Sequence, residues 1–328
     1  MPPKAIVLND KKVVNAWCMY DWANSVYSLT ITSAIFPVYY TEVTQQFGIG
    51  DRVNFFGFEV INSVLYSYAL SFSFLVVAAM LPLLSGIADY GGKKKGFMKF
   101  FAYLGGLSGM GLYFFTGLNI ELGILLSGTA SIGYSGSLVF YDSYLPEIVS
   151  HDKLDRTSAR GFSFGYVGSV LLLVVNLVMV QFPDMFGLTD GGQAARLSFL
   201  TVGIWWIGFS QITFYYLPKN IHHKVAEGSY LTRGYEEIIK VFRSLKELPD
   251  LKRYLAAFFF YNTGVQTVMY LAVLFATKEL TDMSDSELIL TILIIQIVAV
   301  AGSMIFARVS DKKGNKAALM TLVIIWIV

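Results

Sequence analysis

Residues 60–88 read VINSVLYSYALSFSFLVVAAMLPLLSGIA, without a single Asp, Glu, Lys or Arg. An α-helix needs about 20 apolar residues to cross the hydrocarbon core of a bilayer, and this run exceeds that length. Seven more uncharged runs of comparable length follow the same pattern, at 22–41, 100–120, 122–141, 161–183, 197–218, 254–277 and 288–307. Because backbone polar groups must be paired inside lipid, we predict an all-α membrane protein with eight complete transmembrane helices.

The composition suits a bilayer rather than water. Hydrophobic residues make up 55% of the chain and charged residues 15%, against about 25% in a typical soluble domain. The net charge of +2 is too small to indicate a nucleic-acid partner. The single cysteine, Cys18, excludes an internal disulfide and a multi-cysteine metal site, and we expect neither a metal nor a cofactor.

Two short patterns resemble enzyme motifs but lack their context. Residues 161–165 read GFSFG, and this nucleophile motif requires a strand–turn–helix and a histidine partner. Here it opens an uncharged run, while the three histidines lie in charged loops. Residues 91–94 read GGKK, without the spacing or the Ser or Thr of a P-loop. We expect no catalytic residue and no ATP-driven step.

Positive charge alternates between the segments that separate the runs. The odd-numbered segments, counted from the N-terminus, hold 22 of the 25 Lys and Arg residues, and the even-numbered ones hold only Arg52, Arg196 and Lys278. Because Lys and Arg concentrate in cytoplasmic loops, this asymmetry places the N-terminus in the cytoplasm. We expect a multi-pass membrane protein with its N-terminus in the cytoplasm.

A long charged loop divides the chain. We predict an N-terminal six-helix half over 1–218, a cytoplasmic loop over 219–253 and a C-terminal half over 254–328. Within the loop, apolar residues from Tyr235 to Leu248 recur at helical spacing among lysines and arginines, which indicates an amphipathic helix on the membrane surface or a solvated linker helix. The last run, 317–328, would rise only about 18 Å, so we expect a truncated ninth helix.

Two turns at equivalent places in the halves share the pattern Asp-x-x-Gly-x-Lys. The first, in GIADYGGKKK (86–95), contains Asp89, Gly92 and Lys94. The second, in ARVSDKKGNK (307–316), contains Asp311, Gly314 and Lys316. Repeats of this kind underlie alternating access, in which one half rocks against the other. A solvated basic turn that merely follows the positive-inside rule is the alternative.

These turns resemble the signature loop between helices 2 and 3 of the major facilitator superfamily, although Tyr90 stands where a basic residue is usual. The resemblance implies a major facilitator type helical bundle. It also implies that Asp89 and Asp311 pair with helix ends of the opposite half and lock a gate. For Asp311 that partner would lie near residues 158–160, with Arg160 as the cation.

Four further motifs narrow the family: YDWANS (20–25), FYDSYLPE (140–147), SARGFSFGYVGS (158–169) and FYNTGVQT (260–267). Together they resemble the autophagy-related vacuolar effluxer branch of that superfamily, with its prokaryotic relatives. The resemblance covers essentially the whole chain. It implies efflux of neutral amino acids or a related small metabolite. Thr263 stands where the motif leads us to expect an acid, so any ion-coupling role at that position is in doubt.

The first helix carries a polar stripe. Five residues of it share one helical face: Asp21, Asn24, Ser25, Ser28 and Thr32. A polar face is expensive in lipid, so we expect this one to look into the bundle or a water-filled cavity. Interhelical hydrogen bonding is the alternative, favoured for the hydroxyls, whereas Asp21 and Asn24 favour function.

Other predicted helices add polar side chains to this solute path. The seventh contributes Tyr261, Asn262, Gln266 and Tyr270, and the fourth contributes Ser131, Ser135 and Asp142. Amides donate and accept hydrogen bonds without a charge, which suits a polar or zwitterionic solute. Asp142 has the alternative role of anchoring its helix through Arg156 or Arg160.

We therefore predict a monomeric secondary transporter that moves a small solute across the lipid bilayer by alternating access. A proton is a candidate coupling partner, carried by Asp21 or Asp142, because membrane carboxylates commonly relay protons. The alternative from another class is a membrane receptor or scaffold that kept the fold without transport. That alternative predicts an interior plugged by side chains.

Overall fold

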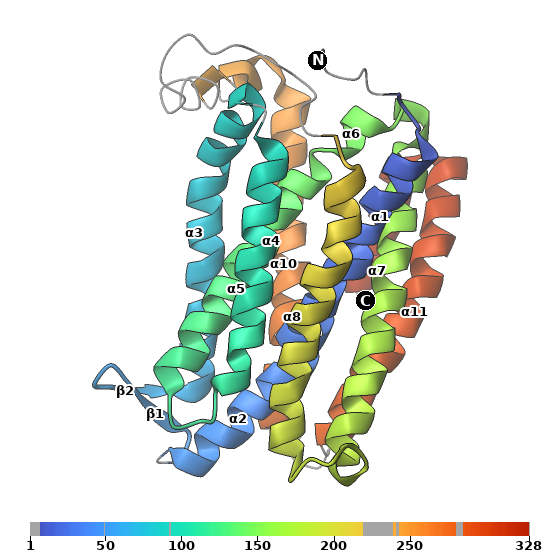
Figure 1. The fold of residues 1–328 in the computed structure, drawn as a ribbon. Coiled ribbons are helices and arrows are strands. Elements are labelled where there is room, and N and C mark those ends of the chain that lie inside the picture. The colour runs from blue at the N-terminus through green and yellow to red at the C-terminus, as the bar shows by residue number, and fades with distance from the viewer. Residues whose placement is uncertain are drawn as a thin grey trace.

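The computed structural model describes residues 7–48, 50–91, 93–218, 239–240, 243–279 and 285–327. Nearly all of these residues lie in helices that run alongside one another in an elongated bundle (Figure 1). The all-α architecture predicted from the uncharged runs is confirmed, and each of the nine predicted ranges is at least largely helical where it is described.

The first membrane helix is longer than its uncharged run. It begins as α1 (Lys11–Val26), continues as a π-helical segment, η1 (Tyr27–Ile35), and ends as α2 (Phe36–Phe47). Asp10 caps the start by accepting a hydrogen bond from the backbone N–H of Lys12 at 2.8 Å. The uncharged run 22–41 therefore does not mark the start of this helix, and Asp21 lies well inside α1.

The other helices of the first bundle (residues 11–217) follow in sequence. They are α3 (Asn62–Gly91), α4 (Lys94–Gly111), α5 (Ile120–Asp142), the short α6 (Leu145–Ile148), α7 (Leu154–Gln181) and α8 (Gly191–Tyr216). Single 3₁₀ turns connect several of them: η2 (Leu112–Phe114), η3 (His151–Lys153) and η4 (Pro183–Phe186).

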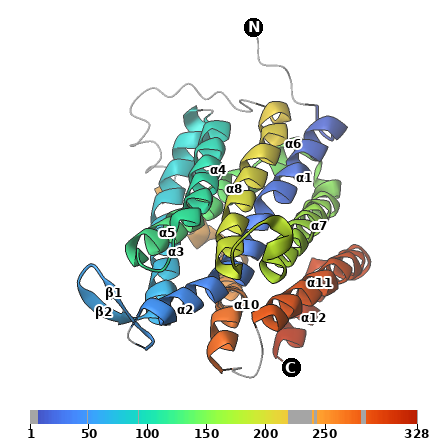
Figure 2. The same ribbon diagram turned by 60° about the horizontal axis from the view of Figure 1, so that its bottom comes forward.

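Three helices make up the rest of the described chain: α10 (Pro249–Glu279), α11 (Asp285–Lys313) and α12 (Asn315–Ile327). They gather on one side of the first bundle (Figure 2), where α11 packs against α7, and α10 packs against η1 and α2. Part of the predicted amphipathic segment of the long loop, including Tyr235, Ile238 and Phe242, lies outside the described residues, and residues 239–240 and 243–247 of it are helical.

A β-hairpin separates α2 from α3, where the sequence predicted only a loop and the start of a helix. Strand β1 (Arg52–Phe55) pairs antiparallel with β2 (Phe58–Ile61) and projects from the end of the bundle (Figure 2). Phe56 and Gly57 form the turn with φ angles of 48° and 88°. Residues 60 and 61 are thus strand, and the helix begins at Asn62.

Five helices are long and apolar enough to cross a membrane within the described part of the chain: 62–82, 120–148, 151–181, 191–216 and 290–313. The first helix is divided by its π-helical segment, α4 carries Lys94, Lys95 and Lys99, and α12 is short. The count of eight complete spans and a truncated ninth stays a prediction.

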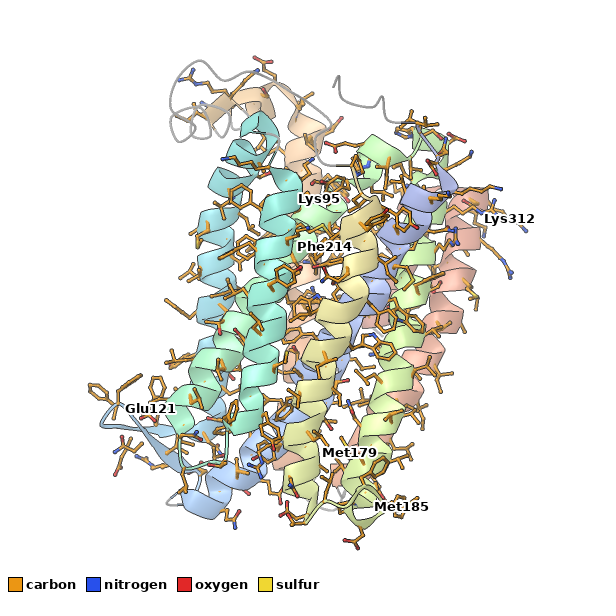
Figure 3. The ribbon with its side chains drawn as sticks, in the orientation of Figure 1. Lys95, Glu121, Met179, Met185, Phe214 and Lys312 are labelled. Atoms are coloured by element: carbon orange, nitrogen blue, oxygen red, sulfur yellow. The ribbon has the colours of Figure 1, made fainter. Side chains whose placement is uncertain are left out.

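The two ends of the bundle differ in the charges that they carry. Lys95, at the start of α4, and Lys312, at the end of α11, lie at the same end as the N-terminus, whereas Glu121, Met179 and Met185 lie at the opposite end (Figure 3). The α3–α4 and α11–α12 turns therefore emerge on one side. This placement is what two equivalent gating turns require.

Glycines set the closest helix crossings in the first bundle. A Cβ at Gly133 of α5 would overlap the backbone of Gly105 on α4, and one at Gly106 would lie 2.6 Å from Ile207 on α8. Small residues let membrane helices approach this closely. The glycine-rich stretch of α4 therefore serves packing.

Candidate functional site

Asp21 is the best-ordered member of the predicted solute path. Its side chain is only 5% exposed, and its Oδ2 accepts a hydrogen bond of 2.8 Å from the Tyr141 hydroxyl on α5. Trp17, one turn earlier on α1, stacks on the Tyr141 ring at 4.3 Å and donates from its indole N–H to the Tyr141 carbonyl at 3.0 Å. A buried carboxyl is thus held between two helices.

The α7 glycines form the third wall around Asp21. A Cβ at Gly161 would lie 2.6 Å from Asp21 Oδ2 and 3.2 Å from the Tyr141 hydroxyl, and one at Gly165 would overlap Ser25. Any side chain at these positions would displace the Asp21–Tyr141 pair. The SARGFSFGYVGS motif therefore makes room for the YDWANS motif, a relation that the sequence alone did not show.

The other polar residues of the helix-1 stripe differ in burial and in hydrogen bonding. Asn24 is 1% exposed, and its Oδ1 lies 3.5 Å from the Ser25 hydroxyl. Ser28 is half-buried and donates to the Ser25 carbonyl at 3.1 Å, so its hydroxyl is used within its own helix. Asp21 and Asn24 are the buried polar pair that the sequence favoured for function.

Ser131 joins α5 to the π-helical segment. Its hydroxyl lies 2.9 Å from the hydroxyl of Tyr27, and either oxygen can donate. The Tyr27 ring lies 5.2 Å from the ring of Tyr134 and 5.5 Å from that of Trp206 on α8. Ser135, one turn beyond Ser131, is half-buried. Aromatic rings therefore surround the hydroxyl pair in the middle of the bundle.

Asp142 does not belong to this buried group. It is exposed as the last residue of α5, and among the described residues no ion pair joins it to Arg156 or Arg160. Neither the predicted anchoring role nor a place beside Asp21 is visible in the structure. Tyr141, its neighbour, is the residue of that motif that reaches the helix-1 carboxyl.

The predicted path residues of helix 7 lie on α10. Tyr261, Asn262 and Gln266 are half-buried there, and the helix packs against η1 and α2. Within the described part of the chain, no hydrogen bond joins Asn262 or Gln266 to helix 1. The side chain of Tyr270 lies outside the described residues. Helix α10 therefore packs against helix 1, but among the described residues no hydrogen bond joins these polar side chains to it.

The first gating turn is fastened by lysines. Lys94 forms an ion pair of 2.6 Å with Glu147 of α6, with the two side chains 12% and 18% exposed, and its ammonium group lies 5.5 Å from the Tyr144 ring. Lys95 is buried and donates to the carbonyl of Leu217 at the end of α8. These contacts tie α4, α6 and α8 together at the basic end of the bundle.

Glu147 is the last residue of the FYDSYLPE motif, but no role was predicted for it from the sequence. The signal was available, since a carboxylate and the Lys93–Lys95 run both follow membrane helices at the same end. The side chain of Asp89 and the whole of Gly92 lie outside the described residues.

The second gating turn is more open. Gly314 adopts φ 82°, the left-handed conformation that a glycine turn allows, and Asp311 and Lys316 are exposed. The guanidinium group of Arg160 lies 5.5 Å from the Phe164 ring. Over the residues that the structure covers, no ion pair joins Asp311 to Arg160, although α11 packs on α7 as the proposed gate requires.

Comparison with solved structures defines the fold. The bundle resembles the xylose transporter XylE from E. coli in a partially occluded inward-open conformation, with a TM-score of 0.57 and 12% sequence identity over 94% of this chain and 74% of that one. A D-xylose-proton symporter matches with a TM-score of 0.52 and 12% identity over 92% of this chain and 69% of that one. The fold is that of major facilitator transporters.

The family follows from the sequence. The family model described as "Vacuole effluxer Atg22 like" matches residues 9–328, and the chain belongs to this family. The resemblance inferred from the four motifs is confirmed, and the chain is a multi-pass membrane transporter of the major facilitator type.

Relatives occur in bacteria and fungi. The "Uncharacterized MFS-type transporter YxiO" of Bacillus subtilis (strain 168) is 27% identical over 97% of this chain and 72% of its own length. "Autophagy-related protein 22-1" of Penicillium rubens is 23% identical over 84% of this chain and 57% of its own length.

Proposed function

We propose that this protein exports small polar solutes, neutral amino acids in particular, by secondary active transport with alternating access. The observation that carries the proposal is the buried Asp21–Tyr141 pair, with buried Asn24 one turn away on α1. An ionisable group inside a membrane helix usually marks a solute or ion pathway. The family's description as a vacuole effluxer supports solute efflux.

The chemistry of the site suits a zwitterion. A carboxylate at Asp21 would attract the ammonium group of an amino acid, and the amides of Asn24, Asn262 and Gln266 would donate to its carboxylate and accept from its polar atoms. The aromatic rings of Tyr27, Tyr134 and Trp206 offer apolar contact to a side chain. Because a zwitterion carries no net charge, the protein needs no net positive charge to bind it.

Alternating access would use the two turns at the basic end. The first bundle and the helices from α10 onward would rock about η1, against which both α8 and α10 pack. The Lys94–Glu147 pair would keep the first turn rigid while the halves separate. The N-terminus and this basic end would face the cytoplasm, as the excess of Lys and Arg favours.

We further propose that Asp21 carries a coupled proton. Of the two candidate carboxyls, Asp21 is buried and bonded to a neutral hydroxyl donor, whereas Asp142 is exposed. A buried carboxyl that changes between hydrogen-bonding partners can gain or lose a proton as the site opens. Asp142 would then serve only the end of α5.

Flux of radiolabelled leucine and tyrosine in proteoliposomes tests the proposal. Wild-type protein should carry flux that a pH gradient accelerates, and Asp21→Asn should lose at least about tenfold of it together with the pH dependence. Tyr141→Phe should shift the pH profile. The matched control is Tyr39→Phe on α2, because the Tyr39 hydroxyl is equally buried but donates to the Phe115 carbonyl at 2.8 Å.

Two results would contradict the proposal. Absence of flux with any of the twenty amino acids would overturn the substrate class. The receptor alternative would be supported if no variant carried flux and the Asp21→Asn protein still signalled or acted as a scaffold normally. Equal effects of Tyr141→Phe and Tyr39→Phe would remove the special role of the Asp21–Tyr141 bond.

A further inference from the structure

The first membrane helix contains a long π-helical segment that no sequence motif predicted. It spans Tyr27–Ile35, nine residues, between two α-helical parts of the same helix. π-Helical geometry is rare, occurs mostly as single-turn bulges, and is frequent at functional sites. The segment is central in the molecule, since α7, α8, α10 and α11 all pack against it.

Two threonines in this segment are buried without a hydrogen bond. Thr30 is 0% exposed and Thr32 is 3% exposed, and within the described residues neither hydroxyl has a partner. In an α-helix a threonine hydroxyl commonly bonds to the carbonyl four residues earlier. The carbonyls in that position belong to Val26 and Ser28, and the π-helical winding leaves both threonine bonds unmade.

The α-helical continuation of the same helix gives the contrast. Thr41 donates to the Pro37 carbonyl at 2.9 Å, and Thr44 donates to the Tyr40 carbonyl at 2.6 Å. Both are buried, as Thr30 and Thr32 are. The same residue type at the same depth in one helix is therefore satisfied in α2 and unsatisfied in η1. The winding of the backbone makes the difference.

Asn24, just before the segment, adds a third unpartnered group. Its side chain is 1% exposed, and among the residues described its Nδ2 donates to no acceptor. A buried polar group without a partner is strongly unfavourable, so native proteins retain one where something else supplies the bond. Three such groups within nine residues of one helix indicate a binding element for a hydrogen-bonding molecule.

We infer that helix 1 binds the transported solute through Asn24 and Thr32, which share its polar face, and that η1 rewinds to an α-helix when the solute leaves. Rewinding would give Thr30 and Thr32 their own backbone carbonyls, as in α2. The Thr32 hydroxyl would then be satisfied by the solute in the π form and by its own helix in the α form. This inference rests on the proposed transport function and identifies the residues and the motion that serve it.

Asn24 and Thr32 also define the class of solute. They are an amide and a hydroxyl, with no charge on either, so they suit an uncharged or zwitterionic molecule with both donors and acceptors. Rewinding would change the twist between α1, which holds Asp21, and α2. Release of the solute would therefore move the Asp21–Tyr141 pair relative to the far end of helix 1.

Paired valine substitutions test the inference, because valine keeps the shape of threonine and removes the hydroxyl. In proteoliposomes, Thr30→Val with Thr32→Val should raise the KM for the transported amino acid at least about tenfold. The matched control, Thr41→Val with Thr44→Val, should change KM less than about twofold, because those hydroxyls already bond to carbonyls of their own helix and, for Thr44, to the Asn62 amide.

Thermal unfolding with and without solute gives a readout that does not depend on flux. Without solute, the Thr30→Val, Thr32→Val protein and the control pair should both lose stability, because each removes hydroxyls that bond to backbone carbonyls in the α-helical form. Saturating amino acid should raise the Tm of wild type and of the control pair by at least about 2 °C and should leave the Tm of the Thr30→Val, Thr32→Val protein unchanged. Wild-type flux with equal KM values for the two paired variants would overturn this inference alone. Absence of wild-type flux would overturn the proposed function instead. An equal solute-induced rise in Tm for the Thr30, Thr32 variant and for wild type would also overturn the inference.

Discussion

The first bundle and the helices from α10 onward are built from similar apolar sequence but are packed differently. In the apolar window of α8, 44% of the residues are buried, against 6% in the window of α11. Most helical glycines of the first bundle, Gly96 and Gly208 excepted, lie against neighbouring helices, whereas a Cβ at Gly264 of α10 or Gly302 of α11 would meet nothing within 4 Å. Hydropathy alone does not distinguish these two environments.

The difference indicates where structural constraint is concentrated. Close glycine crossings, a buried ion pair and the Asp21–Tyr141 bond all fall within residues 11–217. The α10 and α11 helices offer large exposed apolar faces, which a bilayer accepts without specific partners. We therefore expect substitutions of the same kind to have unequal effects in the two regions.

The largest difference is expected for glycine-to-alanine substitutions. Gly133→Ala should destabilise the protein by about 3 kcal/mol, because the added Cβ would overlap the Gly105 backbone, which cannot rotate away. Gly302→Ala should be neutral or stabilise by up to about 1 kcal/mol, since alanine favours helix and has free space there. Chemical unfolding in detergent micelles measures both. Equal losses would show that the two regions are packed alike.

Ion pairs should show the next largest difference. Glu147→Gln should cost about 2 kcal/mol, because the 2.6 Å bond to Lys94 is largely shielded from water. Asp250→Asn on α10 should cost less than about 0.5 kcal/mol, because its 3.4 Å pair with Arg253 is exposed. A double-mutant cycle with Lys94→Met isolates the pair. A coupling energy near zero would show that the Lys94–Glu147 contact contributes nothing to the fold.

The smallest effect is expected at the start of α8. The backbone N–H of Gln193 and the Thr189 hydroxyl donate to the Asp190 carboxylate and lower its pKa below the ordinary value. A lowered pKa means that the carboxylate stabilises the fold above about pH 4 and that this contribution is lost at lower pH. Asp190→Ala should cost about 1 kcal/mol at pH 7, and the difference from wild type should shrink toward pH 3. A difference that stays constant with pH would contradict this assignment.

The sequence predicted most of the helices because bilayer length and uncharged runs impose them. Charged residues ended the predicted runs, but they did not end the helices. Lys11 and Lys12 lie inside α1, since a helix can continue past the membrane surface into water, and Asp21 lies inside it as a buried carboxyl that accepts from Tyr141. The β-hairpin at Arg52–Ile61 was missed because its strands are four residues each and merge with the following apolar run.

The candidate site was predicted in part. A polar face on helix 1 pointed to Asp21 and Asn24, and both are buried. Tyr141 was missed as a partner because tyrosines are numerous and nothing in their spacing tells which one faces a carboxyl. The π-helical winding of Tyr27–Ile35 was also missed, since it depends on helices packed around it rather than on its own residues.

Solute protection of a single thiol tests the central claim, that helix 1 lines the solute path, most directly. Cys18 is the only cysteine and is buried, so Ser28→Cys in a Cys18→Ser background places one reporter on the path face. Saturating transported amino acid should slow its labelling by a small thiol reagent at least about fivefold. His151→Cys, in an exposed turn outside the path, should label at the same rate with and without solute. A Ser28→Cys protein that transports normally but labels at one rate in both conditions would contradict the account.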